Sequence, residues 1–147
     1  MDIAWAVMID AKDFVRRFEA WWADPDPSQL GDLLAPDVVL VQPIVAHTRD
    51  LEGAKRTFTA LLAAIPDLKM TVRNWASEGD AVIIEFTLAG TLGGKPFVWD
   101  NVDRFTVNTD GLATERVNYH NSMSTTWMML SRPNAWRQLW RSGILKR

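Results

Sequence analysis

The chain contains no cysteine among its 147 residues. This absence excludes disulfide bonds, thiolate metal sites and cysteine nucleophiles, and it suits a reducing compartment. The first ten residues carry a short apolar run without a basic leader or a small-residue cleavage site, and the run is far too short to span a bilayer. We therefore expect a cytoplasmic protein.

The patterns of metal- and phosphate-dependent chemistry are also missing. The two histidines and the scattered acids show no metal-ligand spacing, no glycine-rich phosphate loop follows a strand, and no nucleophile elbow is present. The formal net charge is only −2, so the molecule as a whole has no electrostatic reason to bind nucleic acid. The sequence predicts no metal, no cofactor and no nucleic-acid partner.

The sequence does contain enough apolar and aromatic residues to form the hydrophobic core of one domain. Hydrophobic residues make up 48% of the chain, eight residues are tryptophan, and no stretch rich in proline, glycine or serine suggests a linker. Tryptophan is large and carries a single N–H, so it tends to line cores, interfaces and pockets. We expect most tryptophans to lie in the core or at a dimer contact and one or two to touch a ligand.

The apolar periodicity predicts helices first and strands afterwards. Three helices are expected in the first half, each opened by a capping aspartate, and the second extends through Leu34. From residue 68 the period becomes two, and residues 108–111 form a hairpin turn signal. The order is two helices, a strand, a helix and four strands, which predicts an α+β fold with helices over one face of a curved, mostly antiparallel sheet. The expected helix caps are Asp10, Asp26 and Asp50.

Several short motifs occur in a family-like order and spacing. The segment LAPDVV at residues 34–39 is followed by GKP at 94–96, VD at 102–103 and DG at 110–111. This pattern resembles the nuclear transport factor 2-like superfamily, which includes ketosteroid isomerases, limonene epoxide hydrolases, scytalone dehydratases and SnoaL-like polyketide cyclases. The resemblance implies a cone-shaped α+β barrel with a deep pocket. We expect this domain to span residues 1–121 and a basic C-terminal extension to span residues 122–147.

The resemblance also sets the phase of the strands. If Asp103 points into the pocket as its family counterpart does, alternation turns every second neighbour the same way, while Asp100, Val102 and Arg104 point outward. The pocket is then mostly apolar with a few polar groups, which is typical of a small-molecule site. The other residues expected to face inward are Ile84, Phe86, Leu88, Trp99, Asn101, Phe105, Arg116, Asn118 and His120. The expected ligand-binding residues are Gln42, Phe86, Trp99, Asn101, Phe105 and Asn118.

Asp103 and His120 are the candidate catalytic residues. A carboxyl group among aromatic rings loses hydration; as a neutral acid it could donate a hydrogen bond to an oxyanion, and as a carboxylate it could remove a proton. The alternative is a structural ion pair of Asp103 with Arg116 or Arg104. An imidazole is a natural proton carrier, and SnoaL-like cyclases resemble this arrangement in using an aspartate and a histidine. A histidine near a strand end can equally be structural, and we expect His47 to be a solvated loop residue.

Two family mechanisms fit the sequence poorly. In ketosteroid isomerases the position matching Gln42 carries the aspartate that shuttles the proton, and glutamine cannot take up a proton. The position of the family's hydrogen-bonding tyrosine falls near residues 18–22, where no hydroxyl is present. The two acids and the arginine of the epoxide hydrolases would fall near Ile84, Phe86 and Asn118.

The C-terminal extension is basic. Residues 122–147 contain five basic residues and no acid, so removing them takes the formal net charge from −2 to −7 for residues 1–121. Pro133 can begin a helix with Trp136, Leu139, Trp140 and Ile144 near one face. We expect this helix to dock over the pocket mouth or on a partner subunit. The alternative is a segment that lies on a membrane surface.

Two classes of function remain. The first is a cofactor-free acid–base enzyme, an isomerase, cyclase or dehydratase, that acts on a small apolar oxygenated ring compound. The second is a non-catalytic domain of the same fold that binds a small molecule or a protein. We also expect a homodimer, because Trp75 and alternating apolar residues are predicted on the convex face of the sheet.

Overall fold

The computed structural model describes residues 8–42, 47–120, 127 and 130–144, and its elements follow the predicted order. No helix in these ranges is both long and apolar enough to cross a membrane. The elements are α1 (Ala11–Ala23), the 3₁₀ helix η1 (Pro27–Asp32), β1 (Leu34–Val41), α2 (Leu51–Ala64), β2 (Lys69–Glu78), β3 (Ala81–Leu92), β4 (Lys95–Val107), β5 (Ala113–His120) and α4 (Pro133–Ser142).

All three predicted helix caps are confirmed. Asp10, Asp26 and Asp50 each accept a hydrogen bond from a backbone N–H in the first turn of the helix that follows. The predicted extent of the second helix is wrong, because it is a short 3₁₀ turn and Leu34 already belongs to β1. Pairing with β5 causes the difference: the N–H of Ala113 donates to the carbonyl of Leu33 at 2.8 Å, and Leu34 pairs with Ala113.

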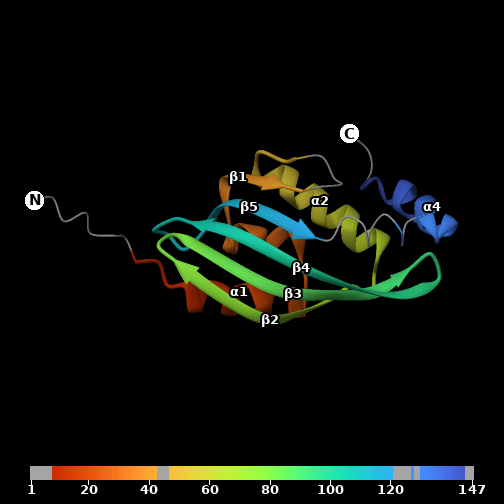
Figure 1. Cartoon of the computed structure of the whole chain (residues 1–147). Coiled ribbons are helices and arrows are strands. Elements are labelled where there is room, and N and C mark those ends of the chain that lie inside the picture. Colours follow the sequence, from red (N-terminus) through yellow and green to blue (C-terminus); the bar gives the residue numbers. More distant parts are fainter. Residues whose placement is uncertain (1–7, 43–46, 121–126, 128–129, 145–147) are drawn as a thin grey trace, which may run out of the picture.

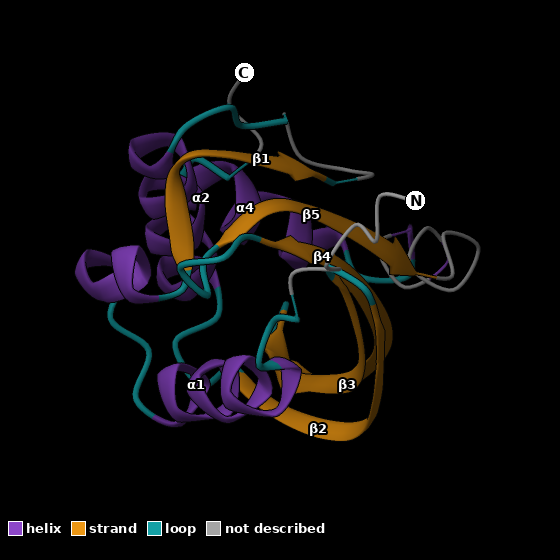
Figure 2. Ribbon diagram, turned by 90° about the vertical axis from the view of Figure 1, so that its left-hand side faces the viewer, coloured by secondary structure: helices purple, strands orange, loops and turns teal. Residues whose placement is uncertain are grey.

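The five strands form one curved, open sheet in the order β1-β5-β4-β3-β2 (Figure 1). β2 to β5 form the predicted antiparallel meander, and β1 pairs in parallel with β5. Figure 2 shows α1 crossing the hollow side of the sheet, while α2 lies beside β1 and completes the cone. The predicted α+β architecture is confirmed.

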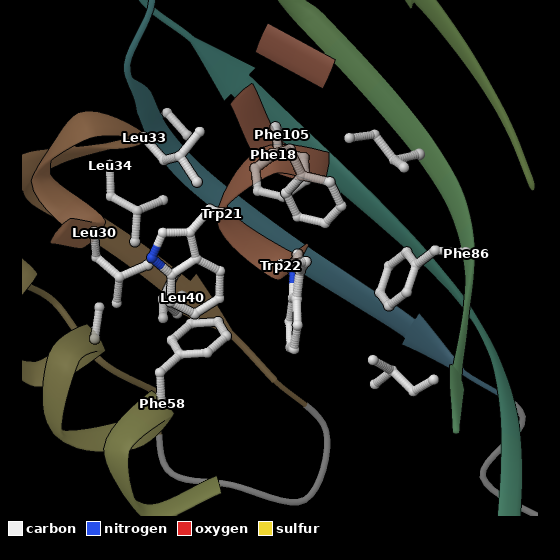
Figure 3. Packing of buried hydrophobic residues seen from close by; sticks show 14 of the residues in the cluster. Phe18, Trp21, Trp22, Leu30, Leu33, Leu34, Leu40, Phe58, Phe86 and Phe105 are labelled. Atoms are coloured by element: carbon white, nitrogen blue, oxygen red, sulfur yellow. The ribbon is translucent and has the colours of Figure 1, made fainter. Parts of the chain in front are cut away.

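The core lies between α1, α2 and the concave face of the sheet. Phe18 makes edge-to-face contacts with Trp22, Phe86 and Phe105, with ring centroids 5.5–6.5 Å apart. Trp21 and Trp22 both pack against Phe58 of α2 (Figure 3). These contacts join one helix to the next and both to the sheet, so the aromatic stripe predicted for the first helix holds the cone together.

The predicted apolar face of the C-terminal helix is confirmed for Leu139 and Ile144, which are buried, and wrong for the two tryptophans. α4 packs against α2 and the β3–β4 turn of its own chain through Ala135 and Leu139, whereas Trp136 and Trp140 are 47% and 64% exposed. The cause is a close backbone approach: a Cβ atom added at Gly93 would lie 2.9 Å from the backbone nitrogen of Ala135. Only a small side chain fits at this contact, which turns the tryptophans outward.

Candidate functional site

The predicted strand phase is confirmed. On β4 the side chains of Asn101, Asp103 and Phe105 are buried, while Asp100 is exposed. On β5 Arg116 is buried and Tyr119 is 53% exposed. On β3 alternation likewise leaves Glu85 exposed. The three residues that it buries, as predicted, are Ile84, Phe86 and Leu88.

The pairing of β4 with β5 brings the polar residues of both strands together. Asp103 lies opposite Asn118, and Asn101 lies opposite His120. Residues that pair directly across two strands share one face of the sheet, with Cβ atoms about 5 Å apart. Gln42 follows β1, the strand on the other side of β5. Three neighbouring strands thus contribute to one polar stripe on the concave face.

Asp103 is the fully buried centre of this stripe. Nε of Arg116 donates to Oδ2 of Asp103 at 2.6 Å, and Nδ2 of Asn118 donates to Oδ1 at 2.7 Å. The ion pair is therefore with Arg116, whereas Arg104 pairs with Glu115 at 3.2 Å on the partly exposed side. Both oxygens act as acceptors, so the geometry fits a carboxylate rather than the neutral acid.

Asn118 links this carboxylate to His120. A carboxylate only accepts hydrogen bonds, so the amide nitrogen of Asn118 must face Asp103 and its oxygen must face away. That oxygen lies 3.2 Å from Nδ1 of His120. An amide oxygen only accepts, so this hydrogen bond requires a proton on Nδ1, and in the neutral imidazole the lone pair is then on Nε2.

Nε2 of His120 is the atom in the stripe best suited to take up a proton. It is buried and has no hydrogen-bond partner among the described residues. Burial lowers the pKa of His120, because desolvation disfavours the imidazolium. The lowered pKa favours the neutral imidazole, whose Nε2 atom has no partner in the part of the chain that the structure describes.

Two unpartnered donors accompany this nitrogen. Nε2 of Gln42 and Nε1 of Trp99 are buried without a partner in the described part of the chain. The Oε1 atom of Gln42 is used, because Nη1 of Arg116 lies 3.5 Å from it. Ligand oxygen atoms could accept hydrogen bonds from these donors. A buried donor without a hydrogen-bond partner costs about 1–3 kcal/mol of folding free energy.

A small apolar cavity lies between the helices and the sheet. Its volume is about 20 Å³, which is roughly the space of one water molecule. Phe105 is the one predicted ligand-binding residue in its wall, and Arg116 connects it to the polar stripe by lying over the ring of Phe58 at 5.7 Å. The deep pocket expected from the sequence is filled here by aromatic rings. The other lining residues are Phe14, Phe18, Trp21, Trp22, Leu30, Leu33 and Leu34.

The remaining candidate residues lie in the core, in an aromatic pair on β4 and in an exposed loop. Phe86 lies in the core and pairs with Asn101, while the Phe97 and Trp99 rings pack 4.9 Å apart. His47 is exposed, as predicted for a loop residue. Within the described ranges no three potential metal ligands gather.

The predicted site residues do not include Arg116, although alternation places it inward. The signal for this residue is its phase with Asn118 and His120 on the same strand. A charged residue in phase with polar residues that face a core needs a counter-ion, and Asp103 is the buried acid beside it. The aromatic wall from α1 could be read as a core stripe, but nothing in the sequence indicated how completely it fills the cone.

Comparisons with known proteins agree with the fold. A family model of the SnoaL-like domain matches residues 15–116. A proposed SnoaL-like polyketide cyclase from Jannaschia sp. CCS1 shares 21% identity, with 79% of this chain and 88% of that chain covered and a TM-score of 0.68. IdmH, a proposed polyketide cyclase from Streptomyces antibioticus, shares 23% identity over 84% and 97% of the two chains, with a TM-score of 0.70.

A third similar structure contains a ligand. TerC, co-crystallised with polyporic acid, shares 20% identity over 80% of this chain and 95% of that chain, with a TM-score of 0.70. None of the curated proteins matches the chain. These likenesses confirm the nuclear transport factor 2-like fold. The family model covers well over half of the chain, and the chain therefore belongs to the SnoaL-like domain family.

Proposed function

We propose that the protein is a cofactor-free acid–base enzyme that acts on a small, apolar, oxygenated ring compound by isomerisation, cyclisation or dehydration. One observation carries the proposal: Nε2 of His120 is buried and has no hydrogen-bond partner within residues 8–42, 47–120 and 130–144, and burial lowers the pKa of this imidazole. Family membership supports it, because polyketide cyclases are among the proposed activities of similar structures.

His120 is the proposed general base. Its Nε2 atom removes a proton from an acidic C–H or O–H of the ligand, and the electron pair moves onto an adjacent ligand oxygen. Returning the same proton to another atom completes an isomerisation or a ring closure, and delivering it to a leaving hydroxyl releases water. Every step needs only the ligand and the imidazole.

Each of the two donors without a partner in the described residues is proposed to bind an oxygen atom of the ligand. Trp99 supplies an indole N–H and Gln42 supplies an amide N–H, and both are desolvated before a ligand arrives. Donors that need no reorganisation stabilise a developing oxyanion far better than water does. Phe105 provides an apolar wall of the cavity, and Asn101 lies opposite His120 in the polar stripe.

Asp103 acts in this proposal as a positioning residue. It fixes the orientation of Asn118, which in turn fixes the tautomer of His120. Arg116 neutralises the carboxylate and keeps it from turning toward another donor. The polar stripe is thus a relay that controls which imidazole nitrogen carries the proton.

A deuterium-exchange assay tests proton removal without knowledge of the substrate. Cyclic monoketones and polyporic acid, the ligand in the TerC structure, would be screened for binding, and the exchange of the α-C–H groups of the ketones, which is slow in neutral D₂O without a catalyst, would be followed by NMR. We expect the wild type to accelerate exchange of at least one bound ketone and His120→Gln to lose that acceleration while still binding it. Binding without acceleration in the wild type would support the non-catalytic domain instead.

A further inference from the structure

The outward face of α4 combines aromatic and cationic side chains. Trp136 and Trp140 lie one turn apart and are 47% and 64% exposed. Arg137 and Arg141 also lie one turn apart, and both are exposed. Residues four apart on a helix are neighbours, so two adjacent rows run along this face, one of indole rings and one of guanidinium groups. We call these four residues the Trp–Arg face.

The orientation of this face is fixed from the inside. Gln138 donates to the carbonyl of Ala64 at the end of α2, and its Oε1 atom accepts from the N–H of Gly93 at 3.0 Å. Arg132 donates to the carbonyls of Leu92 and Pro96 at 3.2 and 3.0 Å. α4 is therefore docked by its opposite side, and the Trp–Arg face remains on the surface of the folded chain.

The charge distribution separates this helix from the rest of the molecule. Residues 122–147 carry five positive charges and no negative charge, while residues 1–121 carry a net charge of −7. Figure 1 places α4 at one end of the molecule, beside the turn between β3 and β4. Trp127 and Leu130, which precede the helix, are 74% and 66% exposed. The basic and aromatic residues are thus concentrated at one end of a chain whose residues 1–121 carry a net negative charge.

We propose that the Trp–Arg face binds the surface of an anionic membrane, with α4 lying flat on it. Indole rings favour the interface between headgroups and acyl chains, because one part of the ring is apolar and its N–H is polar. Arginine pairs with lipid phosphates and is attracted by anionic lipids. The acidic body would be repelled, so the protein would bind in one orientation, through this end.

A lipid surface fits this face better than a nucleic acid does. Stable nucleic-acid binding through charge needs several phosphate contacts in a row, whereas this face offers two guanidinium groups beside a body of the same sign as the phosphates. On a bilayer, the two indole rings can insert at the level of the headgroups while the two guanidinium groups beside them contact lipid phosphates. The proposal does not depend on the chemistry proposed for His120.

Vesicle flotation tests the proposal with the intact chain. The probes are phosphatidylcholine vesicles with and without phosphatidylserine. We expect the wild type to float with the phosphatidylserine vesicles only, and to be released as salt is added. Trp136→Ser/Trp140→Ser and Arg137→Gln/Arg141→Gln should both lose binding, and the arginine variant should lower the partition coefficient about thirtyfold.

Matched variants at other exposed positions serve as controls. Arg56→Gln/Arg73→Gln removes the same number of charges, and Trp75→Ser removes a tryptophan that is 39% exposed on β2. These variants should float like the wild type. No flotation of the wild type, or flotation that the α4 variants leave unchanged, would overturn the proposal. So would a dimer that depends on the Trp–Arg face, or binding of single-stranded DNA through it without binding of lipid.

Discussion

Replacing Asp103 by asparagine should switch the tautomer of His120. The introduced amide can still accept from Arg116 through its oxygen, but its nitrogen then faces the amide nitrogen of Asn118. Two donors in contact force the Asn118 amide to turn over, so that its nitrogen faces Nδ1 of His120. Nδ1 must then accept, and the imidazole proton moves to Nε2. The proposed base would point its N–H at the ligand.

The size of both effects follows from the burial of the pair. Asp103 and Arg116 have side chains 0% and 10% exposed, and removing one charge from such a pair costs about 3–5 kcal/mol. Asparagine keeps the volume and one acceptor, so we expect about 3 kcal/mol, near the lower limit. With the lone pair on Nδ1 instead of Nε2, the variant should lose the contribution of a general base. Its catalysed rate of deuterium exchange should then be about 10²–10⁴-fold below that of the wild type.

Two assays separate these consequences. Urea unfolding gives the stability loss, and long-range ¹⁵N–¹H spectra of the His120 ring report which nitrogen carries the proton. Asp100→Asn is the matched control, because it makes the same change on the same strand at a side chain that is 79% exposed. It should alter stability by no more than about 0.5 kcal/mol. An unchanged Nδ1–H tautomer in Asp103→Asn would refute the relay.

Three further predictions concern His120, the cavity wall and the docking of α4. Burial lowers the pKa of His120, so the unfolded chain binds this proton more readily than the folded chain. Its contribution to stability is therefore complete above the ordinary imidazole pKa and declines as the pH falls below it; urea midpoints in His120→Gln should lack this part of the pH dependence. Phe58→Ala should destabilise the fold by about 3–5 kcal/mol and, by enlarging the cavity, tighten the binding of polyporic acid measured by calorimetry; weaker binding would argue against entry at this point. Gln138→Ala should speed hydrogen exchange of the Gly93 amide, the donor it leaves unpaired, and an unchanged exchange rate would contradict the docking of α4.

Local signals were sufficient to predict most of the fold. Asp10, Asp26 and Asp50 mark helix starts because a capping side chain acts within its own first turn. The strand phase needed the family resemblance, which places Asp103 inward; alternation then determines which way its neighbours on β4 face. Leu34 was assigned to a helix because its strand conformation depends on pairing with Ala113, a residue far away in the sequence.

The site was predictable in part for the same reason. Alternation placed Asp103, Arg116, Asn118 and His120 on one face and Arg104 on the other, which favours Arg116 as the partner of Asp103. The contact between Asn118 and His120 depends on side-chain conformation, which alternation does not give. The filled cone and the outward tryptophans of α4 likewise depend on how closely elements approach, as at Gly93 and Ala135. Periodicity does not encode such distances.

The most direct test of the proposed base is the ring ¹⁵N spectrum of His120 in the wild type at neutral pH. The relay from Asp103 through Asn118 predicts a neutral imidazole with its proton on Nδ1 and an unprotonated Nε2 that shifts when a bound ligand donates to it. A proton on Nε2, or a doubly protonated ring at that pH, would contradict the account.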